Sequence, residues 1–549
     1  MSERWYREAV IYCVDVETFA DSNGDGYGDL QGLIGKLDYL SRLGVTCLWL
    51  NPIHPTPNRD DGYDVADYYA VDSRLGSLGD FAELALQANE RGIRILLDLV
   101  VNHTSNEHPW FQSARNSPQS PYRDWYVWSD TEPPDRKQGI VFPGEQDATW
   151  TWDDAAQAWY YHRFFDFQPD LNWRNPDVRA EIHKVMGFWL QLGVSGFRID
   201  AAPFVLEQVE VGHDPAPQDF SILDHWRQES QWRSGDSVLL CEANVDPDKL
   251  PDYCAATPGG ANDRAHMLFD FLLNARIWLA LARGDAEPVA EALRQPPQLP
   301  AMAQWATFLR NHDELDLSRL TKEQQGEVFR AFAPKADMQL FGRGIRRRLA
   351  PMLKGDRRRI ELAYSLQFTM PGTPVLRYGE EIGMGEDLSL PERNALRTPM
   401  QWRAGAGGGF TTAPVAQQVR PVMTRGRYGC GQVNVTAQQR DADSLLRWFE
   451  QMIRTLRECP EVGVGTCTVI DAALPRSVLA HRCDAAEGSF LALHNLAAVA
   501  RTVDIGRLDG VDSRSLREVF ADGAYDSPNA RLSGLALRPY GYRWFRLNG

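Results

Sequence analysis

Five short segments of the chain carry ionisable side chains, and most of these segments close a run of apolar residues. These segments carry Asp64, Asp98 to His103, Arg198 with Asp200, Glu242, and His312 with Asp313. An apolar run that ends in an ionisable residue is typical of a buried parallel strand whose last side chain faces the mouth of an α/β barrel. One such acid could be a solvated loop residue. Five, with an arginine and two histidines beside them, indicate an active site.

Asp200 and Glu242 form the best pair for cleaving a glycosidic bond. Retaining cleavage needs two carboxyl groups about 5 Å apart, one to attack the anomeric carbon and one to protonate the leaving oxygen. Arg198 precedes Asp200 by two residues, on the same strand face, and its charge would keep Asp200 ionised as a nucleophile must be. Burial behind an apolar strand would raise the pKa of Glu242, which suits a general acid. Either group alone could equally belong to a structural ion pair, and Asp313 favours the catalytic interpretation.

A loop near the N-terminus is rich in oxygen donors at alternate positions. Ca²⁺ prefers six to eight oxygen ligands at about 2.4 Å, and glycines allow the loop to wrap tightly. It is not an EF-hand, because Gly32 stands where the bidentate glutamate would be. The alternative is a polar loop of Asp and Asn turns. The expected ligands of a structural Ca²⁺ are Asp21, Asn23, Asp25, the carbonyl of Tyr27, and Asp29.

The elements that would position these residues alternate between strand and helix. Expected helices include 32–44, 81–92 and 179–193. Expected strands are 9–19, 47–52, 94–101, 196–201, 238–243, 267–271, 306–310 and 373–378. Such alternation predicts a parallel sheet with right-handed crossovers, and eight strands can close it. The predicted fold class is therefore α/β, a (β/α)8 TIM barrel.

Two segments interrupt this alternation and a third follows it. Residues 104–173 are rich in Trp, Tyr, Pro, Asp and Ser without helical periodicity, and we expect them to form an inserted B domain over the barrel mouth. A charged stretch at about 318–355 predicts a helical excursion. Short strands with turns from about 464 predict a C-terminal β-sandwich. The expected domains are a barrel of 1–103 and 174–463, a B domain of 104–173 and a sandwich of 464–549.

Composition narrows the classes of partner. The net charge of −16 argues against nucleic acid and anionic membranes. No run of 18 apolar residues and no apolar signal region are present, so we expect no membrane segment. The eight cysteines lack Cys-x-x-Cys spacing and predict buried reduced thiols in a cytoplasmic protein. The sequence does not determine the oligomeric state, and both a monomer and a homo-oligomer agree with it.

These segments resemble the signature regions of the α-amylase family of retaining α-glycosidases and transglycosylases, over nearly the whole chain. The resemblance implies Asp200 as nucleophile, Glu242 as general acid/base and Asp313 as the acid that holds the sugar 2- and 3-hydroxyls. It implies substrate-binding roles for Tyr63, Asp64, His103, Phe165, Gln168, Arg198, His312 and Arg393. It places a structural Ca²⁺ on the first loop, and it implies no organic cofactor. It also implies a second calcium site, whose ligands would be Asn102, Asp170, the carbonyls of Phe204 and Val205, and Glu207.

Some segments resemble one branch of that family. Residues 168–172 are similar to the oligosaccharide glucosidases. Residues 310–314, 344–351, 381–385 and 397–402 resemble enzymes that interconvert maltose and trehalose by intramolecular glucosyl transfer. The loop 208–223, on the acceptor side, departs from that branch. Arg377 stands where the family usually has an aromatic residue, and Glu380 where it has aspartate.

The leading hypothesis is a retaining α-glucosyl-transferring enzyme that interconverts maltose and trehalose through a covalent glucosyl-aspartate. A hydrolytic α-glucosidase acting on short α-glucosides shares the first half-reaction and differs in whether water reaches the intermediate. A non-catalytic, transporter-accessory relative is the third hypothesis. Such a protein would be expected to lack one or more of the three acids, and all three are present.

Overall fold

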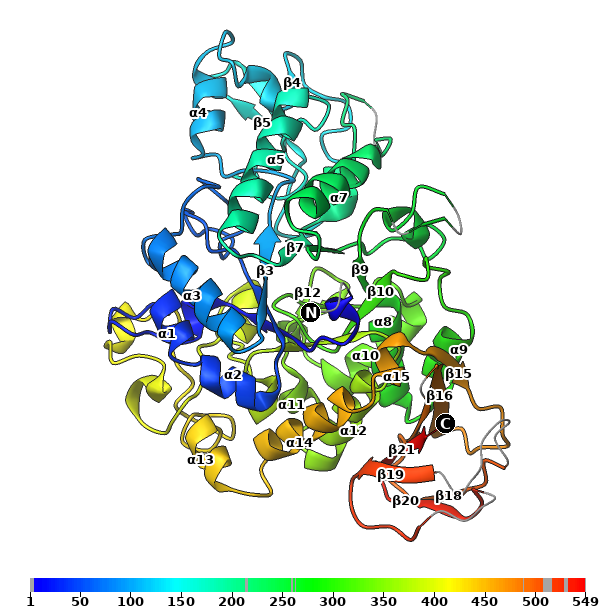
Figure 1. Cartoon of the computed structure of the whole chain (residues 1–549). Helices are drawn as coiled ribbons and strands as arrows, with labels where there is room; N and C mark the ends of the chain where they lie inside the picture. Colours follow the sequence, from blue (N-terminus) through cyan, green and yellow to red (C-terminus); the bar gives the residue numbers. More distant parts are fainter. Residues whose placement is uncertain are drawn as a thin grey trace.

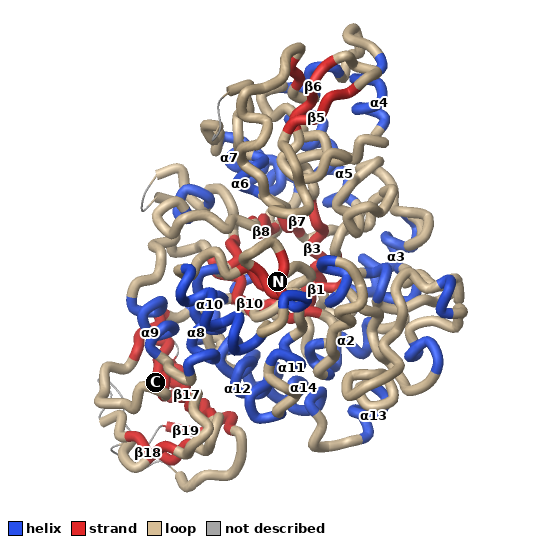
Figure 2. Tube along the Cα trace, turned by 180° about the vertical axis from the view of Figure 1, so that it is seen from behind, coloured by secondary structure: helices blue, strands red, loops and turns tan. Residues whose placement is uncertain are grey.

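Eight parallel strands close a barrel at the centre of the computed structural model, which describes residues 4–212, 216–257, 260–261, 263–486, 488–506, 516–527 and 532–548 (Figures 1 and 2). In the order around the barrel the strands are β1 (Ile11–Val14), β14 (Thr373–Arg377), β10 (Gln304–Phe308), β9 (Met267–Phe269), β8 (Val238–Cys241), β7 (Gly196–Ile199), β3 (Arg94–Leu99) and β2 (Cys47–Leu50). The predicted fold class is confirmed.

Most of these strands end a few residues before the expected ends. The expected strand 196–201 stops at Ile199, and Asp200 begins the following turn. The expected strand 9–19 stops at Val14, where Asp15 accepts a hydrogen bond from the Glu17 amide and starts the 3-10 helix η2 (Val16–Thr18). Apolar residues continue past the last ladder hydrogen bond because the strand ends are also buried. The acids therefore lie on turns at the carboxyl edge of the sheet, where they are free to face a cavity.

Helices surround the barrel. The expected helix 32–44 is two helices, α1 (Leu30–Ile34) and α2 (Leu37–Leu43), separated at Gly35 and Lys36. A capping box of Ser77 and Asp80 starts α3 (Leu78–Glu90). Further helices are α5 (Pro176–Gln191), α6 (Ala202–Val205), α7 (Ser221–Arg233), α8 (Phe271–Arg283), α9 (Glu287–Arg294), α12 (Arg357–Phe368), α13 (Val435–Arg440), α14 (Leu445–Arg457) and α15 (Glu461–Val464).

The segment after β3 lies above the barrel mouth, at the top of Figure 1. Its three-stranded antiparallel sheet has the order β4 (Trp128–Ser129), β6 (Ala158–Tyr161), β5 (Trp150–Asp153). It also contains a helix, α4 (Pro109–Asn116), which the sequence did not predict. At 8 residues this helix is too short to show periodicity, and its signals are Pro109 in the first turn and the His108 ring that accepts from the Trp110 amide.

The segment after β10 is only partly helical, which corrects the expected helical excursion. It contains α10 (Lys322–Phe332) and α11 (Leu349–Met352), and also a small antiparallel sheet of β11 (Leu315–Asp316), β13 (Gly344–Ile345) and β12 (Gln339–Leu340). Each of these strands is only 2 residues long, too short to show alternation. The sheet begins two residues after Asp313, so it holds this segment beside the active-site edge of the barrel.

Two antiparallel sheets form the C-terminal domain. One has the order β15 (Thr466–Val469), β16 (Val478–Ala485), β17 (Gly488–Asn495), β21 (Tyr542–Asn548), β19 (Leu516–Ala521), and the other pairs β18 (Arg501–Val503) with β20 (Leu535–Leu537). Apolar side chains of both sheets, such as Leu491, Leu493 and Val503, pack in one cluster. The expected β-sandwich agrees with this arrangement.

All eight cysteines are free and seven are buried. Within the described ranges, no helix has the length and apolar character that crossing a membrane requires.

Candidate active site

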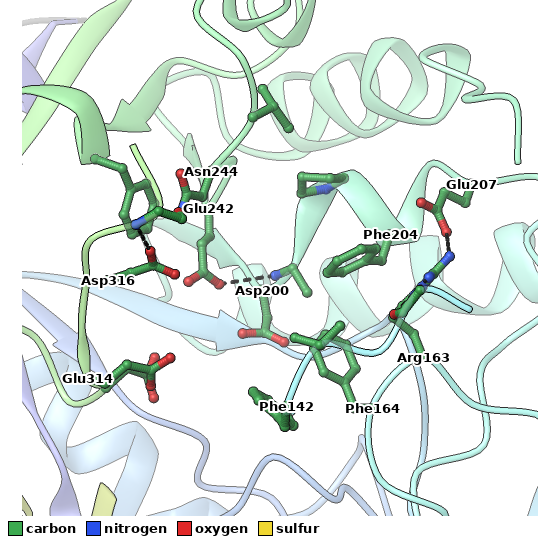
Figure 3. A pocket seen from close by; sticks show the side chains of 18 of the residues that line it. Phe142, Arg163, Phe164, Asp200, Phe204, Glu207, Glu242, Asn244, Glu314 and Asp316 are labelled. Atoms are coloured by element: carbon green, nitrogen blue, oxygen red, sulfur yellow. Dashed lines mark hydrogen bonds and ion pairs between the residues drawn. The ribbon is translucent and has the colours of Figure 1, made fainter. Parts of the chain in front are cut away.

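A cavity of about 930 Å³ opens at the carboxyl edge of the barrel (Figure 3). Residues from the barrel, the B domain and the segment after β10 line it. Among the residues predicted for the site, the lining includes Tyr63, His103, Asp200, Phe204, Glu207, Glu242, His312, Asp313 and Arg393. The structure therefore brings together side chains that lie 330 residues apart in the chain, from Tyr63 to Arg393.

Arg198 lies beneath the carboxylate pair and contacts both members. Its Nη1 donates to Asp200 at 2.6 Å and to Asp98 at 2.8 Å, and its Nη2 donates to Glu242 at 2.7 Å. Arg198 is 1% exposed. The alternation of β7 places its side chain on the same face as Asp200, and β3 and β8 lie on either side of β7. One guanidinium therefore fixes the two carboxyl groups side by side at the cavity floor.

Burial dominates the ionisation of both carboxyl groups. It raises the pKa of Asp200 to about 7, with Arg198 opposing the shift and Asp98 and Asp313 adding to it. Burial also raises the pKa of Glu242 to about 7, again opposed by Arg198. The expectation for Glu242 agrees with this direction. Arg198 lowers the pKa of Asp200, which is the direction expected, but burial outweighs this effect and Arg198 is shared among three acids. Near neutral pH the two carboxyl groups together can hold about one proton. This is the state that catalysis requires, because the general acid must be protonated while the nucleophile is ionised.

Asp313 is held by three cationic or polar donors. Arg393 Nη1 lies 2.7 Å and Arg397 Nη2 lies 3.0 Å from Oδ1, and His312 Nε2 lies 3.1 Å from Oδ2. The pKa of Asp313 lies well below its usual range, because His312 and the two arginines outweigh the effect of burial. Asp313 therefore stays ionised and can accept hydrogen bonds from sugar hydroxyls.

Tyr63 and His312 form one wall of the cavity beside these acids. Their rings stack with centroids 5.3 Å apart and planes 6° apart. The Tyr63 hydroxyl lies 2.8 Å from Asp98 and 2.8 Å from His312 Nε2, and His103 Nε2 lies 2.8 Å from the Tyr63 carbonyl. A fixed aromatic ring of this kind suits the apolar face of a sugar.

Comparison with known proteins agrees with this geometry. The model of the alpha amylase catalytic domain matches residues 13–333 and 345–462, and that of the sucrose hydrolase-like C-terminal domain matches residues 488–546. The chain belongs to the α-amylase family. The chain is an enzyme of this family, and the three acids Asp200, Glu242 and Asp313 line one cavity.

The chain is similar along its whole length to curated relatives. It is 40% identical over 551 residues to a trehalose synthase of Thermus thermophilus, covering 100% of this chain and 56% of the relative. It is 43% identical over 477 residues to the trehalose synthase/amylase TreS of Mycolicibacterium smegmatis, covering 87% of this chain and 80% of the relative. The alpha-amylase from H. orenii superposes with a TM-score of 0.79 at 27% identity, covering 98% of this chain and 99% of that one.

Several residues predicted from the family resemblance do not line the cavity. The Asp64 carboxylate turns toward the preceding loop, where it accepts from Thr56 Oγ1 at 2.7 Å. Gln168 donates to Asp60 at 2.9 Å, and Phe165 stacks behind Phe142 with centroids 5.0 Å apart. These side chains support the residues that face the cavity.

The cavity also has two walls that the sequence did not predict, although Phe204 was expected to offer its carbonyl to calcium. Phe142, Phe164 and Phe204 form an aromatic wall on one side of Asp200, and Glu314 and Asp316 form an acidic wall on the other (Figure 3). Burial raises the pKa of Glu314 to about 7, opposed chiefly by Arg393. Glu314 had a sequence signal, since it directly follows Asp313. Phe142 had none, because it lies in a loop without periodicity.

The predicted first calcium loop is tightly wrapped. Gly24 and Gly26 adopt left-handed φ angles of 83° and 102°, and a Cβ on Gly26 would lie 2.2 Å from the Gln417 carbonyl oxygen. The Asp21 carboxylate accepts from the Gly24 and Gly26 amides, and Asp29 caps α1 by accepting from Gly32. Within the described part of the chain, no group of three or more His, Cys, Asp or Glu side chains is placed to hold a metal ion.

The predicted second calcium set is only partly brought together. Asn102 Nδ2 donates to Asp170 at 3.0 Å, but Glu207 forms an ion pair with Arg163 at 2.5 Å. Arg163 also packs over the Phe204 ring at 5.0 Å. In this arrangement a guanidinium supplies the positive charge that faces Glu207, so the donor set fits a cation poorly. Of the divergent loop 208–223, residues 213–215 lie outside the described residues.

Proposed function

We propose that this α-amylase-family enzyme interconverts maltose and trehalose through a covalent β-glucosyl ester of Asp200. The observation that carries the proposal is the shared guanidinium of Arg198, which fixes Asp200 and Glu242 side by side beneath a cavity of sugar size. The similarity to proteins named trehalose synthase and trehalose synthase/amylase, over 100% and 87% of this chain, supports the choice of substrate.

In the first half-reaction an Asp200 carboxylate oxygen attacks the anomeric carbon of the non-reducing glucose. The bond to the leaving oxygen breaks, and the Glu242 proton moves to that oxygen. Arg198 becomes available to the ester oxygen and to the newly ionised Glu242 at the same time. Asp313, held ionised by Arg393 and Arg397, accepts from the sugar hydroxyls as positive charge develops on the ring.

In the second half-reaction the released glucose turns and presents its anomeric hydroxyl to the ester. Glu242 takes the proton of that hydroxyl, and the new bond displaces Asp200 as a carboxylate. Retention of the released glucose requires a closed acceptor side. Support for closure comes from Arg343, whose Nη1 donates to the Val141 carbonyl at 2.8 Å and so joins the segment after β10 to the B domain.

A time course on ¹³C-labelled maltose followed by NMR tests the function. We expect trehalose as product together with some free glucose, because the acceptor-side loop 208–223 differs from that of related isomerases. Glucose alone, with no trehalose at any time, would assign the chain to the hydrolytic α-glucosidases. A fluorinated glucosyl fluoride should label a peptide containing Asp200, and Asp200→Asn should lower turnover by about four orders of magnitude or more.

We further propose that Ca²⁺ binds the 21–29 loop as a structural ion. The loop offers the hard oxygen donors that Ca²⁺ prefers, and it lies away from the carboxylate pair. An ion that binds only the folded state raises the melting temperature by mass action. A chelator should therefore lower the melting temperature, and elemental analysis should find calcium. An unchanged melting temperature with no bound calcium would contradict this proposal.

We propose that the enzyme is located in a reducing compartment, the cytoplasm. Eight free thiols, seven of them buried, favour the cytoplasm over an oxidising space. Fractionation of cells that produce the protein, with thiol counting after denaturation, tests this point. Recovery outside the cytoplasm would contradict it.

A further inference from the structure

Two cysteines lie directly opposite each other in the C-terminal domain. Cys467 on β15 and Cys483 on β16 are partners in the antiparallel register of these strands, and residues 468–482 separate them along the chain. Cys483 is fully buried, whereas Cys467 is half-buried on the edge strand of its sheet. Solvent therefore reaches this pair of thiols from the Cys467 side.

The hydrogen bonds between the two strands show which type of pair this is. The Ile470 amide donates to the Ala480 carbonyl at 2.9 Å, so these residues form a hydrogen-bonded pair at the end of the ladder. Hydrogen-bonded and non-hydrogen-bonded pairs alternate along an antiparallel ladder, and the cysteines lie three positions away from that pair. Cys467 and Cys483 are therefore a non-hydrogen-bonded pair, the type in which the Cα atoms are about 4.5 Å apart and the side chains are closest.

The two thiols also influence each other directly. The Cys467 thiol is the chief cause that raises the pKa of Cys483 well above its usual range, and burial is the second cause. A neighbour whose effect exceeds that of complete burial must lie within contact distance. A disulfide needs Cα atoms about 4.4–6.8 Å apart, and a non-hydrogen-bonded pair meets this requirement. The two sulfurs can therefore join while both strands keep their register.

We propose that Cys467 and Cys483 form a site of reversible disulfide modification, which closes by exchange with a low-molecular-weight disulfide. The Cys467 thiolate attacks one sulfur of that disulfide, whose sulfur–sulfur bond breaks, and the leaving thiolate takes up the proton that Cys467 lost. Cys483 then loses its proton and attacks the Cys467 sulfur, which releases the second small thiol. The protein thus gives two electrons and two protons to the small disulfide and gains one sulfur–sulfur bond.

Access decides that Cys467 reacts first. Cys483 is 0% exposed, and its raised pKa leaves little thiolate to attack a reagent from solvent. Once Cys467 carries the mixed disulfide, Cys483 lies beside the reacting sulfur, so the second step proceeds at a high effective concentration. The mixed disulfide is therefore a short-lived intermediate and the link between the strands is the product.

The link fastens the edge strand to the part of the domain that contacts the barrel. On β16, His481 Nε2 lies 2.8 Å from the Thr369 carbonyl, at the end of α12. Closing residues 468–482 into a loop restricts the unfolded chain and so stabilises the folded domain. The C-terminal domain and the B domain above the active site lie at opposite ends of Figure 1, so we expect the link to leave catalysis unchanged.

Addition of oxidised glutathione to the reduced protein tests the proposal. After denaturation and alkylation, we expect two of the eight thiols to be lost. Trypsin with a glutamate-specific protease separates Cys459 from Cys467, and mass spectrometry should find peptide 462–476 joined to peptide 483–487. Excess reduced glutathione should reverse the link. The melting temperature of the oxidised protein should rise by about 3 °C, while turnover of p-nitrophenyl α-glucoside stays the same.

Cysteine variants supply the controls. Cys467→Ser and Cys483→Ser should abolish both the link and the rise in melting temperature, whereas Cys430→Ser, at another buried cysteine, should keep both. Retention of all eight thiols in oxidised glutathione would overturn the proposal, as would a link to Cys459 or a stable glutathione adduct on Cys467. If Cys483→Ser does not fold, the half-buried Cys467→Ser and the peptide map of the unmodified protein decide. None of these outcomes depends on the maltose and trehalose assignment.

Discussion

At the scale of single residues, Asp98 adds to the effect of burial on the protonation of Asp200. It is fully buried, shares Arg198 with Asp200, and raises the pKa of Asp200. The acidic limb of kcat/KM reports deprotonation of the nucleophile, and the basic limb reports loss of the Glu242 proton. Because burial raises both pKa values to about 7, we expect a narrow optimum near neutral pH.

Asp98→Asn should move the acidic limb to lower pH by on the order of one unit, since a negative charge next to Asp200 disappears and Arg198 is shared by fewer acids. The pH dependence of kcat/KM measures this shift. Asp38→Asn is the control, because that side chain is 79% exposed, solvent screens its charge and it does not line the cavity. An acidic limb that stays in place or moves to higher pH would contradict the role given to Asp98.

At the scale of elements, the sequence allowed the barrel and its catalytic acids to be predicted, because both depend on local patterns. An apolar run predicts a buried strand, and an acid just after it lies at the carboxyl edge of the barrel, as Asp200 and Glu242 do after β7 and β8. Non-local packing could not be predicted. The two-residue strands β11, β12 and β13 show no alternation, and no spacing indicates that Arg343 reaches Val141.

The segment after β10 and the B domain contact each other beside the cavity, where the proposed function needs the released glucose to be retained. Arg343 donates to the Val141 carbonyl at 2.8 Å and to Asp316 at 3.0 Å, and the Phe341 and Phe142 rings lie 4.8 Å apart. Arg343→Met should admit water and raise the ratio of glucose to trehalose by roughly threefold to tenfold. Product analysis from maltose measures the ratio, and Arg330→Met at the exposed end of α10 is the control. An unchanged ratio in Arg343→Met would show that this contact does not retain the released glucose.

At the scale of the whole molecule, the C-terminal domain shares its core with the barrel. Trp544 and Phe490 belong to the same continuous cluster of buried side chains as Tyr364 and Leu366 of α12, and Trp544 Nε1 donates to Ser365 at 2.8 Å. The next residue on β21, Phe545, points to the opposite side and packs between the two sheets of the domain. One face of β21 therefore packs inside the C-terminal domain, and the opposite face packs against the helices of the barrel domain.

Loss of the joining face should destabilise the catalytic barrel itself. Trp544→Ala should lower the free energy of unfolding by about 3–5 kcal/mol, because it leaves a large cavity and removes the partner of Ser365. Thermal inactivation of the glucosidase activity, compared with calorimetry, measures the effect on the barrel. Phe545→Ala removes a ring of similar burial from inside the sandwich, so it should lower inactivation temperature less than Trp544→Ala does. If Trp544→Ala leaves the inactivation temperature unchanged, the barrel is stable without its C-terminal contact.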